Sequence, residues 1–256
     1  IGSSAAWAAG YTGAGSRIAI IDTGADVDHP SLDPDALKYA LQGSNATIMT
    51  EADLTDEVLN QLNAYTRKAG LTAADFYVNE KIPFGFNYVD ADTDITHDND
   101  TQGDHGSHVT GIAAGNRFVK DEAGNYVAAL DSVMTQGVAP DAQILTMKVF
   151  GKGGGAYDSD YMVAIEDAMV LGADAANLSL GGSFPGYSEY TEEKYRHILD
   201  EIVGSGMVVT ISAGNSGSWF DETAFGLPYA GNVNWATNGS PGSYVNSLCV
   251  ASVDNA

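Results

Sequence analysis

Arg17-Ile18-Ala19-Ile20-Ile21-Asp22-Thr23-Gly24 is the stretch that decides the fold. Residues 18 to 21 are apolar and mostly β-branched, which is typical of a central parallel strand covered on both faces. This strand delivers Asp22 at its carboxyl end, and in open α/β sheets that edge is where functional sites form. We therefore expect an α/β fold with Asp22 in a functional position.

A second stretch, Gly103-Asp104-His105-Gly106-Ser107-His108-Val109-Thr110-Gly111, places a histidine where a loop turns into a helix. Residues 101 to 104 are loop and cap formers, and the residues after 108 supply a small apolar helix face. A neutral imidazole can accept a proton from a nucleophile and return it, provided that a carboxylate fixes its tautomer. We nominate His105 as a catalytic base and Asp22 as its carboxylate.

Further along the chain, predicted strands and helices alternate. This alternation predicts a doubly wound, mostly parallel β-sheet with helices on both faces and right-handed crossovers. The apolar spacing predicts strands at 83–89, 142–149, 175–180, 207–212 and 248–253, and helices at 3–9, 158–172 and 192–204.

The composition limits the partners. With 34 acidic and 11 basic residues among 256, the formal net charge is -23, so nucleic acid and anionic membrane surfaces would be repelled. Adaptation to high salt is the competing explanation of the acidity, but only 18% of the residues are charged. No apolar run is long enough for a membrane span. The length suits one large domain.

Four motifs carry a resemblance to a known family. They are Ile-Ile-Asp-Thr-Gly at 20–24, His-Gly-Ser-His-Val-Thr-Gly at 105–111, Asn-Leu-Ser-Leu-Gly-Gly at 177–182 and Ser-Ala-Gly-Asn at 212–215. In this order they resemble the subtilisin family of serine proteases over essentially the whole chain. The resemblance implies a three-layer α/β/α fold in which Asp22 orients His105, His105 acts as general base and then acid, and Asn215 donates to the oxyanion. Taken alone, Asn215 beside a glycine would be a turn residue.

The resemblance also implies a polypeptide substrate. Two stretches match those that border the substrate cleft in the family, and their backbone can pair with an extended peptide as an added strand. A phosphate-binding loop is the alternative, but no Gly-Lys-Ser/Thr follows and the surroundings are acidic. The residues concerned are Gly153, Gly154 and Gly155 in the first stretch and Ser179, Leu180 and Gly181 in the second.

The nucleophile of the family is not found. Its Gly-Thr-Ser-Met-Ala-x-Pro type motif has no match after Asn215, so the resemblance implies a serine supplied from beyond residue 256 by the remainder of the same catalytic domain. We expect residues 1–256 alone to be inactive. The second hypothesis is a protease-like binding module that has lost its serine. The intact Asp22, His105 and Asn215 argue against that hypothesis.

One segment points to a branch of the family. Residues 36–80 look most like the cell-envelope branch, such as lactococcal cell-wall proteinases and streptococcal complement-cleaving peptidases. That branch implies a protease-associated domain inserted after residue 256, before the serine, and a location that is extracellular, secreted or cell-wall attached. Within the segment, Leu54, Val58, Leu62 and Tyr65 predict one amphipathic helix capped by Thr50 or Asp53. This helix is either a surface decoration or a substrate-facing exosite.

The loop before His105 is acidic. Its Asp-x-Asp-x-Asp start at Asp90 is similar to a calcium loop, but Ile95 stands where an EF-hand needs Gly and Thr101 where it needs Glu. A solvated acidic loop is the default, a looser calcium site stays open, and no cofactor is required. A preference of the same loop for basic substrate residues is a separate hypothesis, because the loop ends at His105. His108 does not have zinc-hydrolase spacing, so we expect it to be buried and hydrogen-bonded beneath the site.

Overall fold

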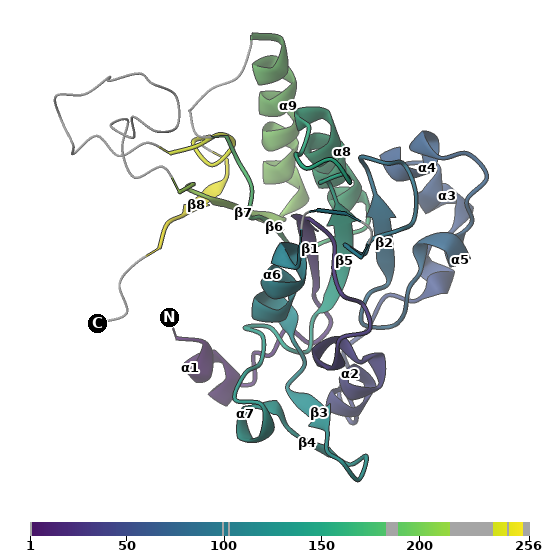
Figure 1. The fold of residues 1–256 in the computed structure, drawn as a ribbon, viewed down its shortest axis with the longest axis vertical. Coiled ribbons are helices and arrows are strands. Elements are labelled where there is room, and N and C mark those ends of the chain that lie inside the picture. The colour runs from purple at the N-terminus through teal and green to yellow at the C-terminus, as the bar shows by residue number, and fades with distance from the viewer. Residues whose placement is uncertain are drawn as a thin grey trace, which may run out of the picture. The chain divides into compact units, whose positions relative to one another are not determined.

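The computed structural model describes residues 2–98, 100–101, 103–182, 189–215, 238–244 and 246–252 (Figure 1). The chain divides into two compact units, Ile1–Asp174 and Ala175–Ala256.

The first unit contains three parallel strands in the order β2-β5-β1. They are β1 (Arg17–Asp22), β2 (Phe84–Asn87) and β5 (Gln143–Lys148). Every residue of β2 and β5 is buried, which explains why their sequences show no alternation of polar and apolar residues. Lys148 stands opposite Asp22 on one side and Asn87 on the other. The carboxyl ends of the three strands therefore bring these polar residues to one edge.

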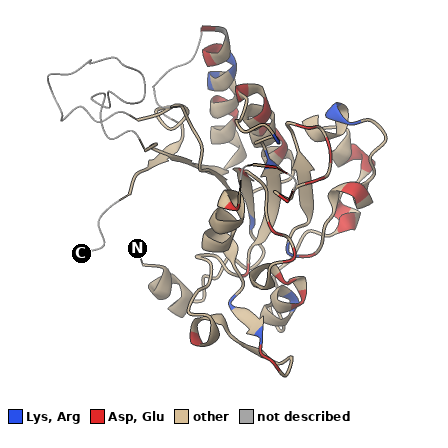
Figure 2. Cartoon of the chain, in the orientation of Figure 1, with Lys and Arg blue, Asp and Glu red and all other residues tan. Residues whose placement is uncertain are grey.

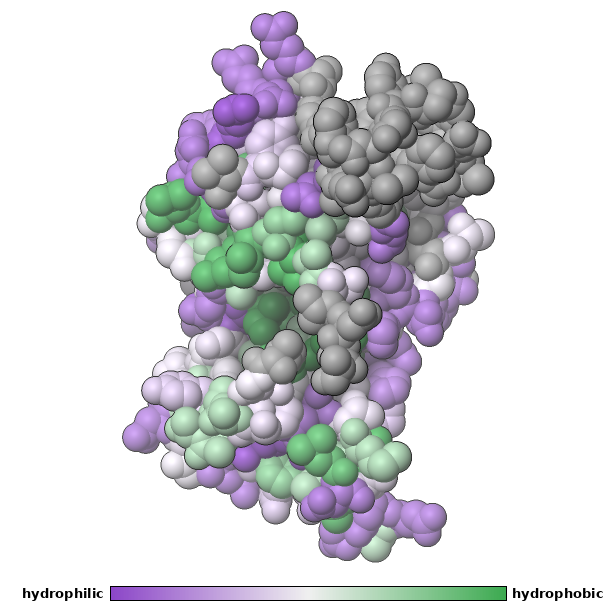
Figure 3. All heavy atoms as spheres, turned by 90° about the vertical axis from the view of Figure 1, so that its left-hand side faces the viewer, coloured by the Kyte–Doolittle hydropathy of each residue, from purple (hydrophilic) through white to green (hydrophobic). Residues whose placement is uncertain are grey.

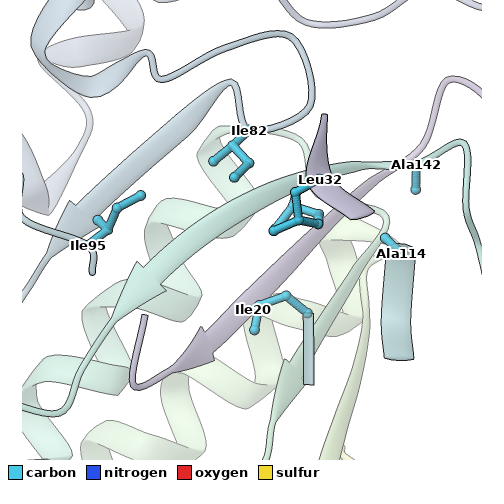
Figure 4. Packing of buried hydrophobic residues seen from close by; sticks show 7 residues of the cluster. Ile20, Leu32, Ile82, Ile95, Ala114 and Ala142 are labelled. Atoms are coloured by element: carbon cyan, nitrogen blue, oxygen red, sulfur yellow. The ribbon is translucent and has the colours of Figure 1, made fainter. Parts of the chain in front are cut away.

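Helices cover both faces of this sheet. Ile20 packs in a cluster with Ala114 at the end of α6 (His105–Ala114), together with Leu32, Ile82 and Ile95 (Figure 4). Successive side chains of a strand point to opposite faces, so Ala19 and Ile21 face the other side. There α8 (Asp158–Val170) contacts β1.

The second unit contains a parallel sheet in the order β6-β7-β8, formed by β6 (Ala175–Leu178), β7 (Val208–Ser212) and β8 (Leu248–Val250). α9 (Glu189–Ser205) joins β6 to β7, and its buried side chains follow the helical period: Tyr195, Ile198, Leu199 and Ile202. The predicted α/β class with mostly parallel strands and flanking helices is confirmed.

The remaining elements are short and belong to the first unit. β3 and β4 form an antiparallel pair. The elements are α1 (Ser3–Ala8), η1 (Pro30–Leu32), α2 (Pro34–Ala40), η2 (Glu51–Asp53), α3 (Asp56–Leu59), α4 (Asn63–Arg67), α5 (Ala73–Phe76), β3 (Phe118–Lys120), β4 (Tyr126–Ala128) and α7 (Ala129–Ser132).

The prediction of a single amphipathic helix within 36–80 is wrong. Four short helical turns, η2, α3, α4 and α5, take its place. Leu62 is extended, with φ -81° and ψ 133°, so α3 and α4 cannot be continuous. A capping box between Thr72 and Asp75 starts α5 anew. The predicted cap is correct in part, because Thr50 and Asp53 form a capping box at η2.

A buried carboxylate anchors this segment to α8. Asp167 is fully buried and accepts hydrogen bonds from the backbone N–H groups of Asn63 (2.7 Å) and Ala64 (2.9 Å) and from the Tyr88 hydroxyl (2.8 Å). Burial raises the pKa of Asp167, whereas the bonds from Ala64, Asn63 and Tyr88 oppose that rise. Asp167 thus satisfies free N–H groups at the start of α4.

A buried lysine joins the segments that precede β2 and β5. Lys81 is fully buried, and its Nζ donates to the carbonyl oxygens of Pro140 (2.9 Å) and Ala142 (2.8 Å). Burial lowers the pKa of Lys81 to about 7, with the charge of Asp141 opposing the shift. A neutral amine keeps two N–H groups, so both carbonyls stay satisfied when Lys81 loses its proton.

Charged residues lie mostly on helices and loops, while the strands are almost free of them (Figure 2). Large apolar side chains are exposed on and near α6 and α7, among them Ile112, Leu130 and Met134. Figure 3 shows exposed apolar surface in green on one face. Among the helices of the described residues, none is long and apolar enough to cross a membrane.

The anchor leads to a first prediction. Asp167→Ala removes the acceptor of four donors, the backbone N–H groups of Asn63 and Ala64, the Asn63 side-chain amide and the Tyr88 hydroxyl. We expect it to lower the free energy of unfolding by about 3 kcal/mol or more. Urea denaturation of the protein expressed from its full reading frame measures this loss. Glu166→Ala removes a neighbouring carboxylate that accepts one bond from Asn63 and should cost less than about 1 kcal/mol. Equal losses of unfolding free energy in the two variants would contradict the anchoring role of Asp167.

The buried lysine predicts a pH dependence of stability. Between about pH 7 and 10.5 the unfolded chain keeps the Lys81 proton that the folded protein releases, so the free energy of unfolding rises with pH in this window. The rise should reach about 1 kcal/mol per pH unit, and below pH 7 the cost of burying the charge is present in full. Lys81→Met should remove this contribution, as measured by denaturation at pH 7 and 9. The exposed Lys68→Met is the control, and an equal pH slope in all three proteins would refute the assignment.

Candidate functional site

β1 delivers Asp22 to the carboxyl edge of the sheet, where its side chain is 1% exposed. Its Oδ1 accepts a hydrogen bond from the backbone N–H of Thr23 and lies 2.7 Å from His105 Nδ1. The structure thus brings together the two residues predicted to act as base and carboxylate, although they are 83 positions apart. A buried carboxylate at Nδ1 holds the proton on that nitrogen and leaves Nε2 to exchange a proton with a reacting group.

Two glycines permit this approach. A Cβ on Gly106 would collide with the carbonyl oxygen of Gly24, and a Cβ on Gly24 would collide with the carbonyl oxygen of Ile95. Gly24 also has φ +105°, a conformation that favours glycine. With both side chains absent, Thr23 Oγ1 accepts a 2.8 Å hydrogen bond from the N–H of Gly106. This bond fixes the first turn of α6 to the turn that follows β1.

His105 is the first residue of α6, and its side chain is 52% exposed. His108 is exposed as well, so the prediction that it is buried beneath the site is wrong. The buried residues of α6 are Gly106, Thr110 and Ala114, which recur every four positions on one face. His108 follows Gly106 by two positions and therefore points away from that face.

Sequence reasoning missed a buried ion pair beside these residues. Lys148 Nζ donates to the carbonyl oxygen of Thr23 (2.7 Å) and to Asp100 Oδ2 (2.6 Å). Both side chains are almost inaccessible, at 2% for Lys148 and 3% for Asp100. The prediction of a solvated acidic loop is therefore wrong at Asp100. The sequence signal was a lysine that ends a buried apolar strand, because such a charge needs a partner.

Three other aspartates of this loop accept hydrogen bonds from its own backbone and side chains. Asp92 accepts from the N–H of Asp94, Asp94 accepts from the N–H and hydroxyl of Thr96, and Asp90 accepts from Asn87 Nδ2. The described part of the chain brings no three or more His, Cys, Asp or Glu side chains together as a metal site. The calcium site stays a prediction.

The predicted substrate-binding stretches lie at strand ends. Gly153, Gly154 and Gly155 follow β5 in the first unit and are exposed, and the last two have positive φ. Thr101 Oγ1 donates to the carbonyl of Lys152 (3.3 Å), so the acidic loop contacts the glycine-rich one.

The other predicted residues follow strands of the second unit. After β6, Leu180 is buried and its carbonyl accepts from Ser212 Oγ (3.1 Å), while Gly181 is exposed. Ser179 is half-buried and accepts a bond from Asn177 Nδ2. Asn215, after β7, is exposed.

Comparison with known proteins finds relatives that are all named as proteases. The chain is 33% identical over 253 residues to the PI-type proteinase of Lactococcus lactis subsp. cremoris, with 96% of this chain covered. It is 31% identical to the minor extracellular protease Vpr of Bacillus subtilis (strain 168), with 85% covered. It is 29% identical to the C5a peptidase of Streptococcus pyogenes serotype M6, with 94% covered. The matched regions are 12%, 20% and 18% of the lengths of these relatives.

The resemblance seen in the four motifs, including its lactococcal and streptococcal branch, is thereby confirmed. The model of the subtilase family matches residues 13–256. A match of this extent, with Asp22 and His105 in contact, leads to one conclusion: the chain belongs to the subtilase family.

Proposed function

We propose that this chain carries the acid–base pair and the oxyanion donor of a serine endopeptidase. The observation that carries the proposal is the 2.7 Å contact between His105 Nδ1 and the buried Asp22 Oδ1 in a chain of the subtilase family. The exposed ring of His105 supports it, because Nε2 must reach a nucleophile and a substrate.

The proposed reaction is acyl transfer. A serine Oγ attacks the peptide carbonyl while its proton passes to His105 Nε2, and Asp22 stabilises the imidazolium that forms. The side-chain amide of Asn215 donates a hydrogen bond to the tetrahedral oxyanion. His105 then gives the proton to the leaving amine, which yields an acyl-enzyme. Water activated by His105 hydrolyses that ester and regenerates the serine.

The proposed substrate is an extended polypeptide. The exposed glycines at 153–155 offer main-chain groups that no side chain covers, and the backbone at 179–181 is the second proposed edge. Main-chain pairing would give affinity for many sequences and leave preference to side chains. Asp98 and Asp104 are exposed in the loop before His105, which supports a preference for basic residues.

The origin of the serine and the location of the protein are also proposals. The serine would come from beyond residue 256, in the remainder of the catalytic domain and after a protease-associated insert. The matched relatives are several times longer than this chain, which leaves room for both parts. An extracellular location, secreted or cell-wall attached, agrees with the printed name of the Bacillus relative and with a net charge of -23. The chemistry needs no cofactor, and calcium would serve stability only.

Labelling with a fluorophosphonate tests the proposal directly. We expect the protein expressed from its full reading frame to be labelled on a serine beyond residue 256, as located by peptide mass. Asp22→Asn should lower kcat by about 10⁴-fold because the histidine loses its tautomer, and His105→Ala should abolish rapid labelling. His108→Ala, three positions away and exposed, is the matched control with unchanged rate. A folded protein that stays unlabelled would instead support the binding module without a serine.

The oxyanion role of Asn215 has its own test. In subtilisin, loss of one oxyanion donor lowers kcat about 10²- to 10³-fold, and we expect Asn215→Ala to fall in that range with KM within about twofold. Steady-state hydrolysis of a peptide amide measures both constants. Asn125→Ala, on the exposed turn between β3 and β4, is the control. A rise in KM at constant kcat would rule out a role confined to the transition state.

A further inference from the structure

The buried pair of Lys148 and Asp100 joins two backbone segments that meet at the candidate site. One hydrogen bond from Lys148 Nζ ends on the carbonyl of Thr23, the residue after Asp22, and the other ends on Asp100. Asp100 lies five positions before His105 in the loop that enters α6. The lysine therefore contacts the chain just after the catalytic carboxylate and just before the catalytic histidine.

Neighbouring contacts make this arrangement rigid. Thr23 bonds to Lys148 through its carbonyl and to the N–H of Gly106 through Oγ1. A Cβ at Gly24 would lie 3.4 Å from Lys148 Cδ, so the lysine stem packs against the same turn. The backbone of Lys148 is held opposite Asp22 by the β1–β5 register. A shift of the Lys148 ammonium would thus be transmitted to the turn that carries Asp22.

Stability alone does not account for two buried charges here. Moving an ion pair out of water costs several kcal/mol per ion, and apolar residues of similar volume are often neutral or stabilising replacements. Apolar side chains cannot, however, donate to a particular carbonyl or hold a particular carboxylate. The ion pair fixes the positions of Thr23 and of the loop before His105, and apolar residues would not do so.

We infer that Lys148 and Asp100 are positioning residues that set the geometry between Asp22 and His105, an inference that rests on the proposed function. They act through the Thr23 turn and the entry to α6. Catalysis is sensitive to such placement, because a misplacement of about 1 Å can lower the rate about 10²-fold.

The test separates position from stability by removing both charges at once. Lys148→Met or Asp100→Leu alone leaves one buried charge without its partner and should lower both the unfolding midpoint and kcat. The double variant Lys148→Met/Asp100→Leu should recover the midpoint of the wild-type protein, while kcat stays lowered by about 10- to 100-fold. We expect KM within twofold, and the rate of fluorophosphonate labelling should fall in parallel with kcat.

The matched control is the ion pair of Arg117 and Asp141, joined at 2.8 Å. Asp141 precedes β5 and so lies at the amino ends of the strands, opposite to Lys148. Arg117→Met/Asp141→Leu should leave kcat and KM unchanged. Asp100→Asn keeps an acceptor oxygen for Lys148, and its kcat should lie between those of the wild type and Lys148→Met even if the double variant fails to fold.

Three outcomes would overturn the inference. Recovery of wild-type kcat in the double variant would show that the pair acts on stability alone. A rise in KM at constant kcat in Asp100→Asn or in the double variant would assign the pair to substrate binding. If the wild-type protein is not labelled and does not hydrolyse peptides, the proposed function itself is wrong. That failure is recognised before any variant is made.

Discussion

The candidate site depends on one close contact between the turn after β1 and the first turn of α6. Gly106 approaches Gly24 so closely that a Cβ on Gly106 would meet the carbonyl oxygen of Gly24, and a Cβ on Gly24 would meet the carbonyl oxygen of Ile95. This approach brings Thr23 Oγ1 to the N–H of Gly106 and Asp22 to His105. A methyl group between the two segments would separate them by more than the tolerance of a hydrogen bond. Gly106 is therefore a geometric condition for the contact between Asp22 and His105, although it bears no functional group.

The chain places its few basic side chains where buried acids need them. Of only 11 Lys and Arg residues, Lys148 pairs with Asp100 and Arg67 pairs with the nearly buried Asp160. Where no cation is available, Asp167 uses backbone N–H groups and a hydroxyl instead. A net charge of -23 is thus compatible with a folded core, because Asp100, Asp160 and Asp167, whose side chains are shielded from water, have cations or hydrogen-bond donors as partners.

The sequence was most informative where one local pattern determines the structure. The apolar run before Asp22 predicts β1, and the glycine-flanked His105 predicts the start of α6. Long-range contacts limit such predictions. Of the four residues whose spacing predicted one helix, Leu54 and Leu62 are buried, whereas Val58 and Tyr65 are only half-buried. Leu59, which that spacing did not include, is buried in place of Val58. Helical spacing of apolar residues therefore predicted burial for only two of the four residues, and it predicted the continuity of the helix wrongly.

Polar contacts that cross between elements were the least predictable. Nothing near Asp100 distinguishes it from the other aspartates of its loop, and its burial follows from Lys148, which is 48 positions away. The assignment of His108 failed for a related reason, because His108 lies three positions after His105 but its side chain faces solvent. Composition and spacing reveal which residue types are present, whereas the partner of a buried charge is decided by the tertiary fold.

Parallel strands explain why the functional candidates could nevertheless be found. Each strand ends at the same edge as its parallel neighbour. A polar residue just after an apolar run can therefore be assigned to that edge from the sequence even when its partner is not known. Asp22 and Lys148 obey this rule in the first unit, and Ser179 and Asn215 follow strands in the second. The rule assigns residues to an edge but sets no distance between them. Within the first unit the close approach of Gly106 to Gly24 and the bonds of Thr23 set this distance, and these contacts bring Asp22 and His105 together.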